Sequence, residues 1–522
     1  MIGIDVLVPL RYDDSLIREK LSTVIGEDYK GDIKIVRREL ISEGNDPLYK
    51  LRIAVTLDKW SEARLVKKSP SAHVLESLEL MIKSAPLPCR PIIVGCGPCG
   101  LFATLTLAEA GVRPILIERG ACMEERQKKV ASFNLGGELD EETNIQFGEG
   151  GAGTFSDGKL KHGKMDRYIY KVLSEFVSCG APENILYDVN AHVGTDLLSG
   201  IISKIKNKII SLGGEVLFNT KLTDLIIKNG SIVGIKCQKD GKETELYSQD
   251  VILAIGHSAR DTFRMLDEKG LKTEARGFGI GVRIEHPREY IDKLIYGKHK
   301  SKIDSAASYR FVTHLKNGRS VYSFCMCPGG TVVAATSKKN AVVTNGMSLH
   351  GRNGENSNAA FLVSVNPNDF GNSALLGLEF QEKLEKTAFD ISGDYKAPAV
   401  RMEDFLNDKV STGFSDVIPT YPRGVVFESA DAFLPDFIKG SLKTAIADFD
   451  EYKKGFYYPD AVLTGIETRT TSPIKLLRDE RHEGTGIKGL FPAGEGAGYS
   501  GGIVSSATDG IKTALNILDK YL

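Results

Sequence analysis

The sequence predicts an α/β protein of three parts, and three observations lead to that fold class. Residues 91–120 have the order strand, glycine turn, helix, strand and acid, which is typical of a dinucleotide-binding βαβ unit. Residues 1–57 have the order β-α-β-β, and strand-like stretches recur through residues 272–480. These patterns predict a Rossmann-type nucleotide-binding domain with an inserted mixed-sheet α+β substrate or cap domain, preceded by a small ferredoxin-like α/β domain.

The N-terminal ferredoxin-like domain is expected to span residues 1–88. Its expected elements are strands at residues 2–8, 32–41 and 48–57, helices at 13–25 and 72–83, a turn at 43–47 and a stiff linker at 85–88. The domain carries no cluster of catalytic residue types. We therefore interpret it as a packing or docking module, and as the expected contact for a protein partner or a second copy of the chain.

The segment that organises the rest of the chain contains the glycine loop at residues 95–100. Gly95 can make the tight turn out of the first strand, Gly97 lets the backbone approach a pyrophosphate, and Gly100 lets the helix pack closely on the sheet. The free N–H groups at the helix N-terminus favour phosphate. Glu118 ends the second strand, where its carboxylate can accept both ribose hydroxyls and would repel a 2′-phosphate.

The first part of the nucleotide domain is expected to extend over residues 89–271, and it contains a second glycine-rich segment at residues 148–159. Such a segment exposes backbone N–H groups that suit a phosphate or a flat ring. A flexible surface loop is the alternative interpretation, and the sequence does not decide between them. Further on, Thr195 is expected to cap a helix at 196–211, and strands are expected at residues 215–218, 222–227, 232–237 and 251–255.

The cap domain is expected at residues 272–480. Its expected strands are residues 278–284, 321–324, 331–335 and 361–365, and its expected helices are residues 377–390 and 430–452.

The C-terminal residues 481–522 are predicted to return to the nucleotide domain. A short strand at 489–492 leads to Gly494 and Glu495, and Gly501 and Gly502 open a helix that continues through about Leu518. An acid at a strand end can hold a polyol hydroxyl, and a helix N-terminus can face an electron-rich ring. This second element suits the ribityl chain and isoalloxazine of FAD and has no use in an NAD site. The alternative is a C-terminal helix that only packs on the sheet.

Four segments of the chain resemble FAD-dependent oxidoreductases of the glutathione-reductase-like superfamily: residues 95–100 with Glu118, 150–159, 254–256 and 493–503. The chain resembles more narrowly the bacterial NAD(FAD)-utilising dehydrogenase or FAD-dependent protein family, through residues 281–287, 323–330, 343–348 and 467–470. The resemblance covers nearly the whole chain and implies FAD binding and oxidoreductase chemistry, without a known substrate. The chain departs from the superfamily at Cys96 and Cys99, where small residues are usual.

The sequence and the resemblance together predict the residues that contact FAD. They are Gly95, Gly97, Pro98, Cys99, Gly100, Glu118, Arg119, Gly151, Ala152, Gly153, Thr154, Leu222, Ala254, Gly256, Gly494, Glu495, Gly501, Gly502 and Ile503. Only one dinucleotide fingerprint is present, because residues 277–281 have the wrong glycine spacing and no helix is expected after them. NAD(P)H would therefore dock transiently beside the flavin, or the electrons would come from elsewhere.

The sequence offers several candidate residues for catalysis but does not identify a catalytic base. Cys325 and Cys327 lie two apart on an expected strand, so both thiols should face one side. They are interpreted either as a thiol pair near the flavin or as small packed residues. His286 and Arg469 could act as an acid, a base or a carboxylate clamp, or could form ion pairs. Cys96 and Cys99 have redox-motif spacing, but packing is the simpler interpretation inside a phosphate loop.

Composition limits the function classes. The chain of 522 residues has 67 basic and 68 acidic residues and a net charge of −1, so no global basic field favours nucleic acid. No membrane span, secretory signal or metal site is predicted, and a cytoplasmic protein with reduced thiols is expected. The leading hypothesis is an FAD-dependent oxidoreductase that acts on a small organic substrate. The alternatives are a flavoprotein with a redox-sensing role or one that docks a protein or RNA partner, and a flavoprotein that binds FAD without catalysis.

Overall fold

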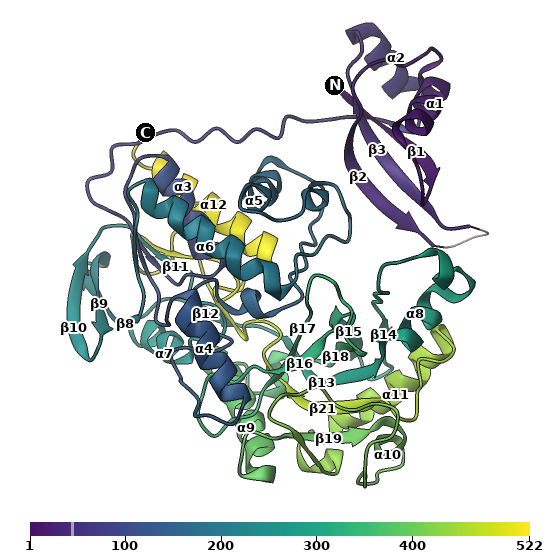
Figure 1. Ribbon diagram of the computed structural model, residues 1–522. Coiled ribbons are helices and arrows are strands. Elements are labelled where there is room, and N and C mark those ends of the chain that lie inside the picture. The colour runs from purple at the N-terminus through teal and green to yellow at the C-terminus, as the bar shows by residue number, and fades with distance from the viewer. Residues whose placement is uncertain (43–45) are drawn as a thin grey trace.

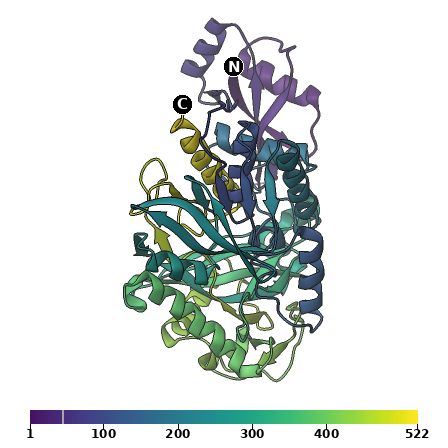
Figure 2. The ribbon, with the colours of Figure 1, turned by 90° about the vertical axis from the view of Figure 1, so that its left-hand side faces the viewer.

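The computed structural model describes residues 1–42 and 46–522. The N-terminal domain lies at one end of the molecule and the helices around residues 374–452 lie at the other (Figures 1 and 2). Within the described residues, no helix is both long enough and apolar enough to cross a membrane.

A four-stranded antiparallel sheet with two helices forms the N-terminal domain. The sheet order is β2-β3-β1-β4, and the elements are β1 (Ile2–Pro9), α1 (Asp14–Ile25), β2 (Lys34–Ile41), β3 (Leu48–Val55), α2 (Lys59–Lys68) and β4 (Ala72–Val74). The sequence-based boundaries of the first four elements are close to those observed. Of the expected turn at residues 43–47, residues 43–45 lie outside the described residues.

The predicted helix at residues 72–83 is wrong. The second helix is α2, which begins after Asp58, whose side chain accepts hydrogen bonds from the N–H groups of Trp60 and Ser61. Residues 72–74 instead pair antiparallel with β1 from Ile2 to Ile4. The open edge of β1 gives their backbone groups hydrogen-bond partners, and this pairing is more stable here than a short helix. Residues 75–90 then lead, without helix or strand, to the rest of the chain (Figure 1).

The N-terminal domain is attached to the body of the molecule through β2. The guanidinium of Arg38 donates to both carboxylate oxygens of Asp188 at 2.6 and 2.8 Å. The backbone of Arg38 also exchanges hydrogen bonds with residues 187 and 189. This short parallel bridge fixes the domain at one point of residues 89–271, which together with residues 481–522 form the expected nucleotide domain and are called the nucleotide-binding half below.

A five-stranded parallel sheet with the order β23-β11-β5-β6-β7 forms the centre of the nucleotide-binding half. Its strands are β5 (Ile92–Val94), β6 (Ile115–Ile117), β7 (Glu215–Leu217), β11 (Val251–Leu253) and β23 (Leu490–Pro492). One face is covered by α3 (Pro98–Glu109), α5 (Arg167–Ser178), α6 (Thr195–Ser211) and α12 (Ile503–Asp519). The strands are buried and apolar, as a parallel sheet covered on both faces requires.

The other face of the parallel sheet is covered by an antiparallel sheet of three strands. They are β8 (Thr220–Lys228), β9 (Ser231–Lys239) and β10 (Lys242–Tyr247), and β10 was not predicted. Leu222, Leu225 and Ile235 pack there against Ile92 and Ile117 of the parallel strands. Helices α4 (Met123–Asn134) and α7 (Arg260–Glu268) complete this half.

The predicted cap for α6 is wrong. Gly194 is the N-cap residue and supplies no side chain. The hydroxyl of Thr195 instead donates to the carbonyl of Thr154 at 2.7 Å. This bond fastens the start of α6 to the glycine-rich segment, so Thr195 has a tertiary role in place of a local one.

Residues 272–480, called the cap half below, are built on a mixed seven-stranded sheet with the order β14-β15-β18-β13-β21-β19-β20. Its strands are β13 (Phe278–Pro287), β14 (Val312–His314), β15 (Ser320–Cys327), β18 (Asn356–Val365), β19 (Ala397–Arg401), β20 (Val425–Phe427) and β21 (Val462–Glu467). Its helices are α8 (Arg288–Tyr296), α9 (Ala374–Ser392), α10 (Met402–Leu406) and α11 (Asp436–Tyr452). Two small sheets, β12 (Thr273–Ala275) with β22 (Ile474–Leu476) and β16 (Thr331–Ala334) with β17 (Thr344–Met347), complete the structure.

Candidate functional site

A cavity of about 450 Å³ lies where the nucleotide-binding half meets the cap half. Its lining includes residues from both glycine segments, from the start of α12 and from β15. These segments are far apart in the sequence, and the fold brings them to one place. The volume lies within the range of about 300–1,000 Å³ that is usual for small-molecule and cofactor sites.

The N-terminus of α3 opens onto this cavity. Gly97 is the N-cap residue, no side chain caps the helix, and Pro98 occupies its first turn. Gly95, with φ of +102°, turns the chain between β5 and α3, and a Cβ atom there would lie 2.3 Å from the carbonyl oxygen of Ala254. The first turn therefore keeps N–H groups for an anion in the cavity, as a phosphate-binding helix start requires.

Glu118 is held at the cavity edge by backbone hydrogen bonds. Its carboxylate is buried and accepts from the N–H groups of Cys96 at 2.8 Å and of Gly120 and Gly148 at 2.9 Å. The carboxylate is fixed and keeps lone pairs for hydroxyl donors of a ligand. The neighbouring Arg119 also lines the cavity.

The glycine-rich segment at residues 148–159 lies inside the molecule, so the surface-loop interpretation is wrong. Gly151, Ala152 and Gly153 line the cavity. A Cβ atom on Gly151 would lie 2.9 Å from the Cα atom of Gly97, so the two glycine segments touch through their backbones. Asp157 continues the segment into the cavity and is almost fully buried.

The N-terminus of α12 reaches the same cavity. Gly502 is its N-cap residue, and no side chain caps this helix either. Cβ atoms at Gly501 and Gly502 would meet open space, apart from the hydroxyl of Ser505 at 3.8 Å from the second. Two uncapped helix starts, a fixed carboxylate and open space beside glycines fit the pyrophosphate, ribose and ring of FAD.

Most of the predicted FAD-contacting residues line this one cavity. The structure places there Gly95, Gly97, Pro98, Cys99, Glu118, Arg119, Gly151, Ala152, Gly153, Leu222, Ala254, Gly256, Glu495, Gly501, Gly502 and Ile503.

Gly100, Thr154 and Gly494 lie outside the lining and support it. A Cβ atom on Gly100 would be 1.8 Å from the carbonyl oxygen of Gly95, and one on Gly494 would be 2.8 Å from the Cβ atom of Cys99. Both glycines therefore serve close packing. Thr154 is buried, and its carbonyl accepts the hydrogen bond from Thr195.

Cys96 and Cys99 are packing residues. Both are buried, and burial raises the pKa of each thiol. All eight cysteines of the chain are free.

Cys325 lies on the cavity wall at an irregularity of β15. The ladder with β18 shifts register between Phe324 and Cys327, and Cys325 has a φ of +39°. The strand is therefore irregular here, and Cys325 lines the cavity while Cys327 is fully buried. The two residues are still neighbours, since the Cys327 Sγ atom lies 3.2 Å from the Cys325 carbonyl oxygen.

Two cations flank this pair of cysteines. The buried guanidinium of Arg283 donates to the Cys325 carbonyl at 3.0 Å and lies 3.6 Å from the Cys327 Sγ atom. The ammonium of Lys159 donates to the carbonyl of Met326, between the two cysteines. A hydrogen bond from Cys327, with Lys159 and Arg283, lowers the pKa of Cys325 to about 5, against the effect of burial.

The carboxylates near Cys325 carry less negative charge than the positive charge of the cations around them. Asp157 bonds Arg352 at 2.9 and 2.5 Å and Lys159 at 3.1 Å, so one carboxylate serves two cations. Glu467 lies 3.3 Å from Arg283, and burial raises the pKa of Glu467 to about 7. The cluster therefore carries excess positive charge at neutral pH, which favours a Cys325 thiolate.

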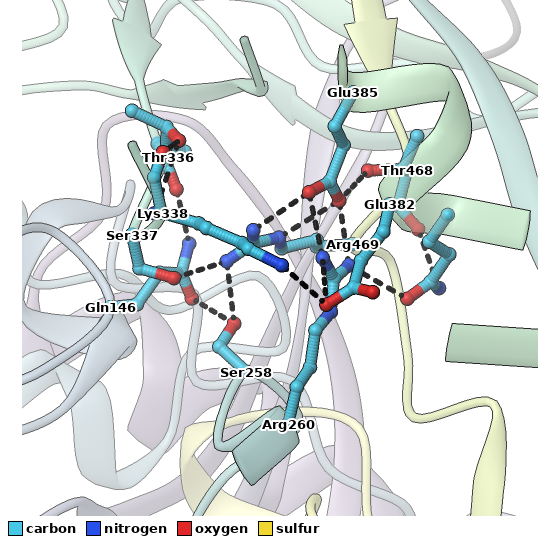
Figure 3. Close-up of polar contacts among 12 residues, drawn as sticks. Gln146, Ser258, Arg260, Thr336, Ser337, Lys338, Glu382, Glu385, Thr468 and Arg469 are labelled. Atoms are coloured by element: carbon cyan, nitrogen blue, oxygen red, sulfur yellow. Dashed lines mark hydrogen bonds and ion pairs between the residues drawn. The ribbon is translucent and has the colours of Figure 1, made fainter. Parts of the chain in front are cut away.

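Arg469 lines the cavity but is fixed in a buried ion-pair network (Figure 3). It donates to Glu385 at 2.8 and 3.0 Å, and Arg260 donates to the same carboxylate at 2.7 and 2.8 Å. Although burial opposes ionisation, the two guanidiniums hold the pKa of Glu385 well below its usual value. Ser337 and Ser258 accept from Arg469 on its other side. The network joins α7, α9 and the segment after β21, and it shapes the cavity wall.

His286 is not positioned for catalysis in this cavity. It lies on β13, within the strand, fully buried beside Tyr290, Phe456 and Tyr458. Its Nε2 atom lies 3.1 Å from the carbonyl oxygen of Phe456, and burial lowers its pKa to about 4. His286 is therefore a neutral core residue.

Sequence reasoning missed several polar residues of the cavity. They are Asp157, Lys159, Lys161, Arg310, Asn345 and Glu467. Asp157 and Lys159 lie in the glycine-rich segment and could have been proposed with it, whereas nothing local marks Lys161 or Arg310. Within the described part of the chain, no group of three or more His, Cys, Asp or Glu residues could hold a metal ion.

Comparisons with known proteins place the cap half in a known family. Residues 277–470 match the family model described as "FAD-dependent protein, C-terminal domain-like". The chain is also 44% identical over 498 residues to an uncharacterised protein of Clostridium beijerinckii, a match that covers 94% of this chain and 92% of the relative.

Two solved structures illustrate more distant similarity. Quinol fumarate reductase of E. coli is 14% identical, with a TM-score of 0.38, over 83% of this chain and 70% of that chain. Glycerol-3-phosphate dehydrogenase of Bacillus halodurans, solved in complex with FAD, is 12% identical, with a TM-score of 0.36, over 83% of this chain and 64% of that chain.

Proposed function

We propose that the chain, which belongs with its Clostridium beijerinckii relative to one protein family and matches the FAD-dependent protein C-terminal domain model over residues 277–470, is an FAD-dependent oxidoreductase of the glutathione-reductase-like type. The observation that carries this proposal is the meeting of two uncapped helix N-termini, those of α3 and α12, at one cavity. In this proposal the parallel sheet and its helices are a Rossmann-type FAD-binding domain, and residues 272–480 are the substrate domain.

The cavity offers a separate group for each part of FAD. The start of α3 would hold the pyrophosphate, Glu118 would hold the adenosine ribose, and Glu495 would hold the ribityl hydroxyls. The start of α12 would stabilise negative charge on the N1–O2 edge of the ring. Bound FAD supplies hydride or electron transfer at its N5 atom.

Cys325 and Cys327 are the catalytic candidates of this site. We infer that Cys325 presents a thiolate to the cavity, with the Sγ atom of buried Cys327 3.2 Å from the Cys325 carbonyl oxygen. Arg283 and Lys159 hold the negative charge in place. In the proposed reaction, the Cys325 thiolate accepts a proton from a substrate held in the cavity, the electron pair of the broken bond stays on the substrate, and Arg469 keeps the adjoining wall rigid.

The spectrum of the purified full-length protein tests FAD binding. We expect a flavin absorbance whose released cofactor is FAD, at one equivalent per chain. A protein that takes up no FAD on reconstitution would contradict the proposal. Anaerobic titration with NADH and with NADPH then tests the electron donor: because the chain has a single dinucleotide fingerprint, bleaching should depend on nicotinamide concentration without a stable complex.

A further inference from the structure

Lys161 and Arg310 stand at the mouth of the cavity without an opposite charge. Both line the cavity and are exposed. Neither side chain has a hydrogen bond or ion pair among the described residues. Partial desolvation of its ammonium, although the residue as a whole is exposed, and the nearby cations Lys159, Arg310 and Arg352 lower the pKa of Lys161. A cation that already experiences repulsion from other cations gains most from an anionic ligand.

The surroundings of these two cations leave this part of the cavity with excess positive charge. Asp157 is already shared by Lys159 and Arg352, so it leaves Lys161 and Arg310 uncompensated. Several uncharged residues line the same cavity, namely Ser308, Ser323, Phe324 and Asn345. Phe324 is 43% exposed, so an apolar surface lies beside the cations. A low-dielectric cleft lined by one sign of charge concentrates ligands of the opposite sign.

We propose that Lys161 and Arg310 form an anion subsite that holds the charged group of the substrate or electron donor next to Cys325. The ligand is a small molecule with an anionic group, either the carboxylate of an organic acid or the phosphate of a nucleotide electron donor. This proposal deepens the proposed function by naming the ligand class. The subsite itself does not require flavin.

Alkylation of Cys325 tests the subsite directly in the full-length protein as purified. Iodoacetate is anionic and iodoacetamide is neutral, and both mark thiolates. The rate ratio of iodoacetate to iodoacetamide is measured at Cys325 by peptide mass spectrometry, with partly exposed Cys122, which lies outside the cavity lining, as the internal reference. We expect the ratio at Cys325 to exceed that at Cys122 by about tenfold at low salt, and to fall as salt screens the charges.

The alkylation rate ratio is compared between two double variants. In Lys161→Gln/Arg310→Gln the ratio at Cys325 should fall to within about twofold of the ratio at Cys122. The matched control Lys316→Gln/Arg481→Gln removes exposed cations that lie outside the cavity and should leave the ratio unchanged. An unchanged ratio in Lys161→Gln/Arg310→Gln, or a Cys325 that neither reagent marks, would overturn the proposal.

Protection experiments separate the two sources of the anion. Succinate, inorganic pyrophosphate and neutral succinamide are compared, at matched ionic strength, as inhibitors of iodoacetamide alkylation at Cys325. Protection by succinate supports an organic acid, and protection by pyrophosphate supports a nucleotide phosphate; equal protection by succinamide, or none by either anion, contradicts the subsite. Because alkylation needs no cofactor, a protein without flavin but with anion-dependent protection would refute the proposed function and leave the subsite standing.

Discussion

Replacement of Gly502 by valine is expected to weaken FAD binding while leaving the fold intact. Gly502 has extended backbone, with φ of −173°, which any residue can adopt. A Cβ atom there would meet only the hydroxyl of Ser505, at 3.8 Å, so the added side chain would point into the cavity. Overpacking a filled site costs about 1–3 kcal/mol, which corresponds to a loss of roughly five- to 150-fold in FAD affinity.

The assay is a fluorescence titration of apoprotein with FAD, together with thermal unfolding of the apoprotein. Gly413→Val is the matched control, because a Cβ atom there meets nothing within 4 Å and the residue lies outside the cavity lining. Gly100→Ala gives the opposite pattern: its Cβ atom would lie 1.8 Å from the Gly95 carbonyl oxygen, so the apoprotein itself should be destabilised. A Gly502→Val protein that binds FAD with wild-type affinity would refute our placement of the flavin ring.

Three further outcomes follow from the buried charges. Glu385→Gln leaves the guanidiniums of Arg260 and Arg469 without their carboxylate and should lower the free energy of unfolding, measured with denaturant, by about 3–5 kcal/mol. Glu382→Gln, which removes a more exposed ion pair with Arg264, should lower it by less than about 1 kcal/mol. Equal effects of the two variants would contradict the network in Figure 3. The alkylation rate of Cys325 by iodoacetamide should fall below a pH of about 5, where its thiolate is protonated, and stay level above it. In Lys159→Met that midpoint should move to higher pH; a midpoint near the ordinary thiol value in wild type would argue against the thiolate.

The nucleotide-binding half could be predicted because its requirements are local. Gly95 has a positive φ, Gly97 allows close backbone approach, and Glu118 ends a strand, so each residue type follows from its own position. The parallel strands are continuous apolar runs, which are recognisable without knowing their partners. The return of residues 489–503 to the same cavity could also be proposed, because the glycines there have no role in an isolated helix.

What the sequence could not reveal depends on contacts between distant residues. The stretch at residues 72–83 is compatible with a helix, and only the edge of the sheet offered by Ile2 to Ile4 makes residues 72–74 a strand. Lys161 and Arg310 belong to different halves of the molecule, and no local pattern brings them together. The same holds for Glu385, whose two arginine partners lie on other elements.

The two halves of the chain contribute different chemistry to one cavity. The nucleotide-binding half supplies backbone N–H groups and a fixed carboxylate, which suit a bound cofactor but include no reactive side chain. The cap half supplies Cys325, at a left-handed backbone position that costs about 1–3 kcal/mol in a residue other than glycine, and the buried Arg283 that bonds its carbonyl. Glycine would relieve that strain, and a regular strand would avoid it. That the fold holds a cysteine there, beside two cations and facing the cavity, is why we assign the substrate chemistry to this end of the site.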